Sequence, residues 1–119
     1  MVQELTADNF QKDVIESSLP VLVDFWAPAC APCGRIAPLI EEVAGEAGGH
    51  FRVGKVNAWE QQALVARYRI SAVPTILVFR GGAVVRTLVG YQDKRRLLEA
   101  LKPALSGPDE RVGRTEIEV

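Results

Sequence analysis

The chain is poor in metal-binding and nucleophilic side chains. Its 119 residues include two cysteines, one histidine and one methionine. A structural zinc site within the chain requires four ligands, and two cysteines with a distant histidine supply at most three. A cysteine–histidine hydrolase is also disfavoured, because it would leave the spacing of the two cysteines unexplained. The histidine, His50, lies in a glycine-rich turn, and we expect it at the surface.

The chain also lacks an excess of charge and any long apolar run. The formal net charge is −1, whereas a nucleic-acid-binding domain should carry a basic face. Every apolar run is far shorter than the ~20 residues that span a bilayer. Residues 1–8 have neither the basic start nor the apolar centre of a signal peptide. We therefore expect a cytoplasmic monomer that binds neither nucleic acid nor membranes.

The two cysteines stand close together at a predicted change of secondary structure. Cys30 and Cys33 follow the apolar run 21–26 and precede a segment with helical spacing. A Cys-x-x-Cys pair at a strand-to-helix junction is typical of a reversible redox disulfide. Because the cytoplasm keeps thiols reduced, a lone cysteine pair there indicates a catalytic or metal-binding role rather than a structural one.

Predicted strands and helices alternate through the first half of the chain. Alternating strand and helix favour parallel pairing through right-handed crossovers, and Gly81-Gly82 predicts a β-hairpin. We expect strands at residues 2–5, 21–26, 51–56, 76–79 and 83–89, with helices at 6–18, from Cys33 to about 45, at 60–68 and from about 92 to 105. The fold class is therefore α/β, with a central mixed sheet of four to five strands and helices on both faces.

The C-terminal end divides into a helix and a charged tail. Four leucines stripe the last predicted helix and are expected in the core: Leu97, Leu98, Leu101 and Leu105. We place the folded domain at residues 1–105 and a tail at 106–119. The tail is expected to be mobile, although the alternation of Thr115, Ile117 and Val119 with glutamates leaves open a strand against a sheet edge.

Asp24 interrupts the apolar run 21–26. It has two readings that the local pattern does not separate. On an edge strand, the carboxylate would turn to water. On an interior strand, it would be buried with a raised pKa close to the cysteines.

Several landmarks occur together in one order, and they resemble those of the thioredoxin family. They are Asp24, Trp26-x-x-x-Cys30-x-Pro32-Cys33, Pro38, Lys55-Val56-Asn57, Val73-Pro74-Thr75 and Val89-Gly90. The resemblance covers about residues 2–105. It implies a thioredoxin fold and an enzyme that exchanges dithiols for disulfides.

The resemblance assigns roles to the residues around the pair. Cys30, at the start of a helix that favours a thiolate, would be the nucleophile, and Cys33 would resolve the mixed disulfide. Asp24 would accept the proton of Cys33, and Lys55 would tune Asp24. In the family, the proline that matches Pro74 is cis. The residues expected to contact substrate are Trp26, Ala29, Ala31, Pro32, Ala72, Val73, Pro74 and Gly90.

Four positions depart from the family pattern. Thioredoxins usually have Trp at the position of Ala29, Gly at that of Ala31, and Lys or Arg at that of Gly34. Trp59 stands where the family often has an acid. It would either replace the surface lost at Ala29 or cap the core, and we expect the second.

The resemblance implies a protein-disulfide reductase that binds no cofactor. A separate thioredoxin reductase would recharge it with electrons from NADPH, and its substrates would be disulfide-containing proteins. Two alternatives stay open. One is a thioredoxin-fold module that binds or senses a specific partner, and the other is a dithiol metal site shared between two chains.

Overall fold

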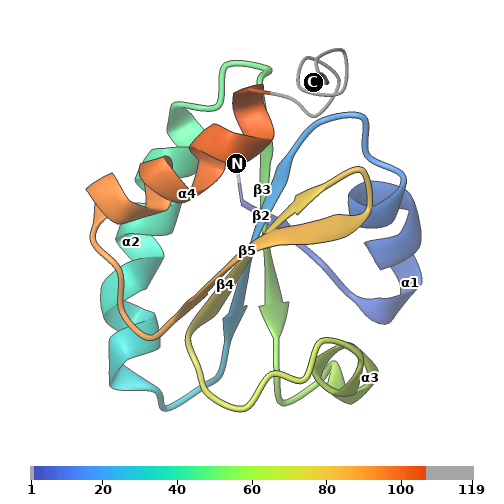
Figure 1. Cartoon of the computed structure of the whole chain (residues 1–119). Helices are drawn as coiled ribbons and strands as arrows, with labels where there is room; N and C mark the ends of the chain where they lie inside the picture. The colour runs from blue at the N-terminus through green and yellow to red at the C-terminus, as the bar shows by residue number, and fades with distance from the viewer. Residues whose placement is uncertain (1, 107–119) are drawn as a thin grey trace, which may run out of the picture.

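The computed structural model describes residues 2–106, and the expectations for the tail lie outside this range. A twisted sheet forms the centre of the molecule, with helices around it (Figure 1). The elements in order are β1 (Gln3–Glu4), α1 (Ala7–Phe10), the π-helical segment η1 (Gln11–Ile15), β2 (Val21–Trp26), α2 (Ala31–Gly45), β3 (Arg52–Asn57), α3 (Gln62–Arg67), β4 (Thr75–Arg80), β5 (Ala83–Val89) and α4 (Lys94–Ser106).

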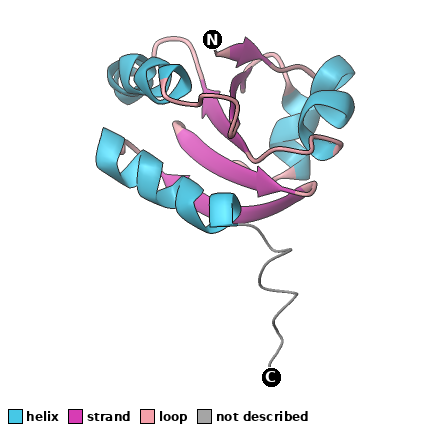
Figure 2. Cartoon of the chain, turned by 90° about the horizontal axis from the view of Figure 1, so that it is seen from above, coloured by secondary structure: helices cyan, strands magenta, loops and turns pink. Residues whose placement is uncertain are grey.

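The sheet has five strands in the order β1-β3-β2-β4-β5. β3 pairs in parallel with both β1 and β2, whereas β4 runs antiparallel to β2 and to β5. Helices lie on both faces of the sheet (Figure 2). The predicted thioredoxin fold with a mixed sheet is confirmed, and β2 is a central strand.

Side-chain alternation along β2 divides its residues between the two faces. Val21, Val23 and Phe25 belong to a core cluster with residues of α1, η1 and α3. Leu22 belongs to the cluster on the opposite face, with residues of α2 and α4. Since successive side chains of a strand point to opposite faces, Asp24 shares the α2 face with Leu22.

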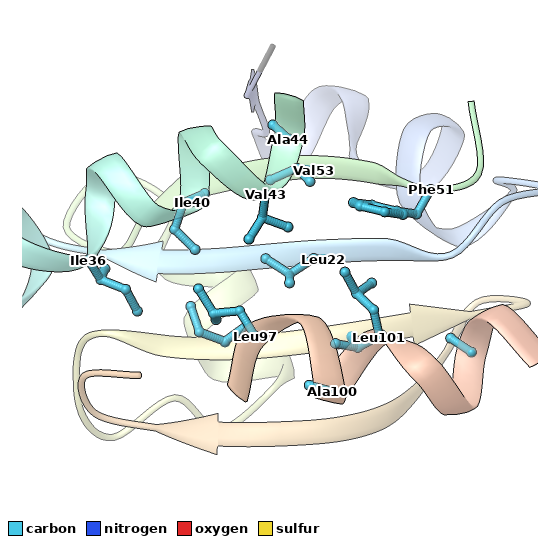
Figure 3. Close-up of a cluster of buried hydrophobic side chains, with 13 residues drawn as sticks. Leu22, Ile36, Ile40, Val43, Ala44, Phe51, Val53, Leu97, Ala100 and Leu101 are labelled. Atoms are coloured by element: carbon cyan, nitrogen blue, oxygen red, sulfur yellow. The ribbon is translucent and has the colours of Figure 1, made fainter. Parts of the chain in front are cut away.

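The core on the α2 face joins both long helices to the sheet (Figure 3). Its residues from α2 are Ile36, Ile40, Val43 and Ala44, and those from α4 are Leu97, Ala100, Leu101 and Ala104. These residues recur at intervals of three or four, as expected for one buried helical stripe. This packing fixes the position of α2, whose first turn carries the cysteines.

Two local expectations for the helices were wrong. Leu97 and Leu101 are fully buried and Leu98 packs against the core, as predicted, but Leu105 is 41% exposed. Ala100 and Ala104 complete the buried stripe instead. The first helix is also shorter than predicted and changes to π-helical geometry after Phe10. Within residues 2–106, no helix is long and apolar enough to cross a membrane.

Gly54 lies where β3 packs closely against the N-terminal segment. A Cβ atom at this position would collide with the side chain of Leu5, which is fully buried. Gly54→Ala should therefore lower the free energy of unfolding by about 1–3 kcal/mol, the usual effect of overpacking. Chemical denaturation measures the change.

Gly45→Ala is the matched control, because a Cβ at Gly45 meets nothing within 4 Å. This variant should lose no stability. Equal stability of both variants would contradict the close packing of Gly54 against Leu5.

Candidate active site

Most of the predicted site residues gather at one end of the strands, where β2 and β3 end and β4 begins. The pairing places Trp26 beside Asn57 and Phe25 beside Thr75. Thr75 in turn lies beside Val89, the last residue of β5. The loops that follow β2, β3 and β5 therefore meet the loop that precedes β4 at one end of the strands (Figure 1).

Cys30 and Cys33 form a disulfide at the start of α2, with a Cα–Cα distance of 5.3 Å. Cys30 is the N-cap residue, and its Sγ accepts a hydrogen bond from the backbone N–H of Cys33 at 3.2 Å. Cys33 is only 4% exposed, whereas Cys30 is partly exposed. Unpaired N–H groups at a helix N-terminus stabilise negative charge, so the geometry favours a thiolate on the accessible sulfur.

Pro32 lies in the first turn of α2. A proline needs no N–H partner in the first turn, where no intrahelical acceptor is present. It therefore fits between the cysteines without disturbing the helix.

Asp24 is buried in the middle of the sheet, at 4% exposure. Burial raises the pKa of its carboxyl from 3.8 to about 7, while the positive charge of Lys55 acts to lower that pKa. Lys55 is the direct neighbour of Asp24 across the β2–β3 pairing. The interior reading of Asp24 is therefore the one that the structure shows.

A cavity of about 320 Å³ joins the acid to the disulfide. Asp24, Lys55, Trp26, Ala29, Cys30 and Cys33 are among the residues that line it. Within residues 2–106, Asp24 Oδ1 and Trp26 Nε1 are buried without a hydrogen-bond partner. The Nζ atom of Lys55 lies 5.8 Å from the centre of the Trp26 ring.

The remaining predicted substrate residues lie on other segments. Val73 O is 3.8 Å from Cys30 Sγ, and the Val73–Pro74 peptide bond is cis. The backbone N–H of Gly90 donates to Pro74 O at 2.8 Å, and Gly90 has a φ of 90°, which favours glycine. Ala72 O accepts from the Thr75 hydroxyl at 2.6 Å. These hydrogen bonds hold residues 72–75 and Gly90 together beside Cys30.

The two alanines of the motif differ in backbone conformation. Ala31 is an exposed residue of α2, next to Cys30. Ala29 is exposed and has a φ of 58°, in the left-handed region that costs a non-glycine residue about 1–2 kcal/mol.

The guanidinium group of Arg35 lies over the Tyr91 ring, 5.9 Å from its centre. Its charge is therefore directed toward the β5 side of the site.

Two supporting residues, Asn57 and Gln92, were not assigned a role from the sequence. Asn57 Oδ1 accepts from the backbone N–H groups of Trp59 and Glu60. The amide of Gln92, which is buried, donates to Val89 O and Gly90 O, both at 3.2 Å. The signal for Asn57 was its place just after a strand, where asparagine often closes a turn. No comparable signal marks Gln92.

Trp59 contradicts the expectation that it caps the core. Its side chain is 62% exposed, on the loop between β3 and α3. Within the described range, no group of three or more His, Cys, Asp or Glu side chains could hold a metal ion.

Comparison with known proteins identifies the family. The thioredoxin family model matches residues 1–103. The chain belongs to the thioredoxin family. A thioredoxin of Streptomyces clavuligerus is 43% identical over 98 residues, covering 82% of this chain and 91% of the relative. Thioredoxin 1 of a Nostoc species is 39% identical over 102 residues, covering 86% and 95%.

A chloroplastic M-type thioredoxin of Chlamydomonas reinhardtii is also similar. It is 41% identical over 99 residues, covering 83% of this chain and 71% of the relative. Together with the Cys30–Cys33 disulfide, these thioredoxin relatives establish the protein as a thiol-disulfide oxidoreductase acting on protein disulfides.

The pKa of Asp24 predicts a pH-dependent effect on stability. With a pKa near 7 when folded and 3.8 when unfolded, Asp24 binds its proton more tightly in the folded state. Stability is therefore lost as the pH rises from ~4 to ~7 and stays lost above that range. Asp24→Asn should raise the free energy of unfolding by about 2–4 kcal/mol at pH 8 and by less than ~1 kcal/mol at pH 4.

Denaturation of the oxidised protein at both pH values measures this difference. Glu41→Gln, at an exposed acid of α2, is the control and should change stability little at either pH. A gain for Asp24→Asn that is the same at pH 4 and pH 8 would refute the raised pKa.

Proposed function

We propose that the protein reduces disulfides of other proteins, with Cys30 as the nucleophile and Cys33 as the resolving thiol. This assignment rests on the unequal exposure of the two residues, because Cys30 is partly exposed to a large substrate whereas Cys33 is buried. Its place at the N-terminus of α2 supports a thiolate at neutral pH.

The reaction proceeds by two exchanges. The Cys30 thiolate attacks one sulfur of the substrate disulfide, and the other substrate sulfur leaves as a thiolate. Cys33 then loses its proton and attacks Cys30 Sγ, which forms the Cys30–Cys33 disulfide and releases the second substrate sulfur as a thiolate. Two electrons pass to the substrate, and the enzyme is oxidised.

Asp24 is the proposed acceptor of the proton from Cys33. Both residues line the same cavity, and a carboxylate with a pKa near 7 is suited to take and release a proton at neutral pH. Lys55 keeps a fraction of Asp24 ionised by opposing the effect of burial.

The oxidised enzyme then needs a supply of electrons. We propose that a thioredoxin reductase returns two electrons from NADPH to the Cys30–Cys33 disulfide, and that the protein itself binds no cofactor. A monomer acting in the cytoplasm fits this cycle, since a reducing compartment keeps the dithiol form available.

Ala29 supports a second candidate function. The exposed alanine leaves little apolar surface directly before Cys30, which suits a module that docks or senses one partner. Such a module would turn over a generic substrate slowly and bind one protein tightly. Fast reduction of insulin by the parent protein would exclude this candidate.

Insulin reduction with NADPH and a thioredoxin reductase tests the proposed function. Cys30→Ser should abolish turnover, because no second thiol is accessible. Cys33→Ser should also stop turnover, but it should accumulate one equivalent of a mixed disulfide with the insulin chain through Cys30. Mass spectrometry of the trapped species identifies the cysteine.

Catalysis by Cys30→Ser at the parent's rate would refute the mechanism. A mixed disulfide formed through Cys33 in the Cys30→Ser variant would reverse the two roles.

A further inference from the structure

Large apolar side chains are exposed at few places in residues 2–106. They are Trp59, Val84, Val89, Tyr91 and Leu105. Trp59 and Val89 are each more than 60% exposed, at 62% and 61%, and Tyr91 is 47% exposed. These three residues lie at the same end of the strands as the disulfide.

The three residues stand on opposite sides of Cys30. Trp59 follows β3, on one side of β2, whereas Val89 ends β5 and Tyr91 follows Gly90 on the far side of β4. Three strand spacings of ~4.8 Å separate β3 from β5, or about 14 Å. An extended chain covers this distance with about four to five residues. Cys30 and Val73 lie between the two ends.

The backbone around Trp59 is held in place on both sides. Its N–H donates to Asn57 Oδ1 at 2.9 Å, and its C=O accepts from Gln62 Nε2 at 3.0 Å. The preceding residue is tied to β2, since the N–H of Ala58 donates to Trp26 O at 2.7 Å. The chain therefore presents an exposed tryptophan on a fixed loop, which limits the entropy lost when the residue binds a partner.

We propose that Trp59 is a specificity-determining residue that contacts the protein substrate on the β3 side of Cys30. Val89 and Tyr91 contact the same segment on the β5 side. The occupant is an extended, apolar segment of a disulfide-containing protein, about four to five residues long, with its disulfide over Cys30. This inference rests on the proposed function, and it assigns to Trp59 the apolar contact that Ala29 does not provide.

The chemistry of the site supports a protein segment over other occupants. Cys30 lies between Trp59 on the β3 side and Tyr91 on the β5 side. A substrate chain that places its disulfide over Cys30 and runs across the ends of the strands therefore contacts both residues. Tryptophan and tyrosine dominate the binding energy of many protein interfaces because each buries a large area with few rotatable bonds. A small disulfide that reaches only Cys30 would not contact Trp59.

Steady-state kinetics with two substrates tests the inference. Insulin is the protein substrate, 5,5′-dithiobis(2-nitrobenzoate) is the small disulfide, and thioredoxin reductase with NADPH supplies the electrons. Trp59→Ala should raise the KM for insulin about fivefold to tenfold with kcat nearly unchanged. It should leave the rate with the small disulfide unchanged, and Trp59→Phe should recover part of the loss.

Leu105→Ala is the matched control. It removes an exposed apolar side chain near the C-terminal end of α4, and it should change neither KM. Thermal unfolding of each variant verifies that the fold is kept.

Two outcomes would overturn the role of Trp59. One is an unchanged KM for insulin in a folded Trp59→Ala variant. The other is an equal loss with both substrates, which would show a general distortion of the site. Either leaves the proposed function standing, whereas failure of that function would appear as retained turnover in Cys30→Ser.

Discussion

The burial of one carboxyl group in a central strand is the constraint on which the site depends. Asp24 interrupts an apolar strand that has a neighbour on each side. Alternation along that strand directs Asp24 to the face covered by α2, the helix that carries both cysteines. An apolar residue there would stabilise the sheet, so the acid costs stability at the position where we propose that it accepts a proton. Perturbed groups of this kind cluster at functional sites.

The rest of the site is arranged around this acid at the ends of the strands. Packing of α2 against α4 and the sheet fixes the first turn of α2 (Figure 3). That turn leaves Cys30 partly exposed and Cys33 buried, and the cavity next to it is lined by both Cys33 and Asp24. On another segment, Val73 O approaches Cys30 while Gly90 is bonded to Pro74. The residues proposed as nucleophile, as proton acceptor and as backbone partner of the substrate therefore lie close together at one end of the strands.

Much of this arrangement could be predicted from the sequence because it follows from local patterns. Strand and helix periods predicted the order of the elements and the mixed sheet, and the motif with its landmarks indicated the family. The environment of Asp24 did not follow from the local pattern, because an edge strand and a central strand carry the same pattern, and only the family resemblance favoured the buried position. Only the antiparallel pairing of β4 with β2, about fifty residues apart, makes the strand central.

Other features depended on contacts that no local pattern encodes. Trp59 was expected in the core, but the hydrogen bonds of Asn57 fix the loop that leaves it exposed. Leu105 lies off the buried stripe of α4, where alanines at 100 and 104 allow close packing. The isomer of the Val73–Pro74 bond likewise has no local signal, since most bonds before proline are trans.

The pKa of Asp24 in the oxidised protein is the most direct test of this account. Carbon-13 NMR of the Asp24 side-chain carboxyl, titrated from pH 3 to pH 10, measures it without catalysis or unfolding. The account predicts a midpoint near the value of about 7 set by burial against the opposing charge of Lys55. A midpoint near 4, that of an ordinary exposed aspartate, would contradict it.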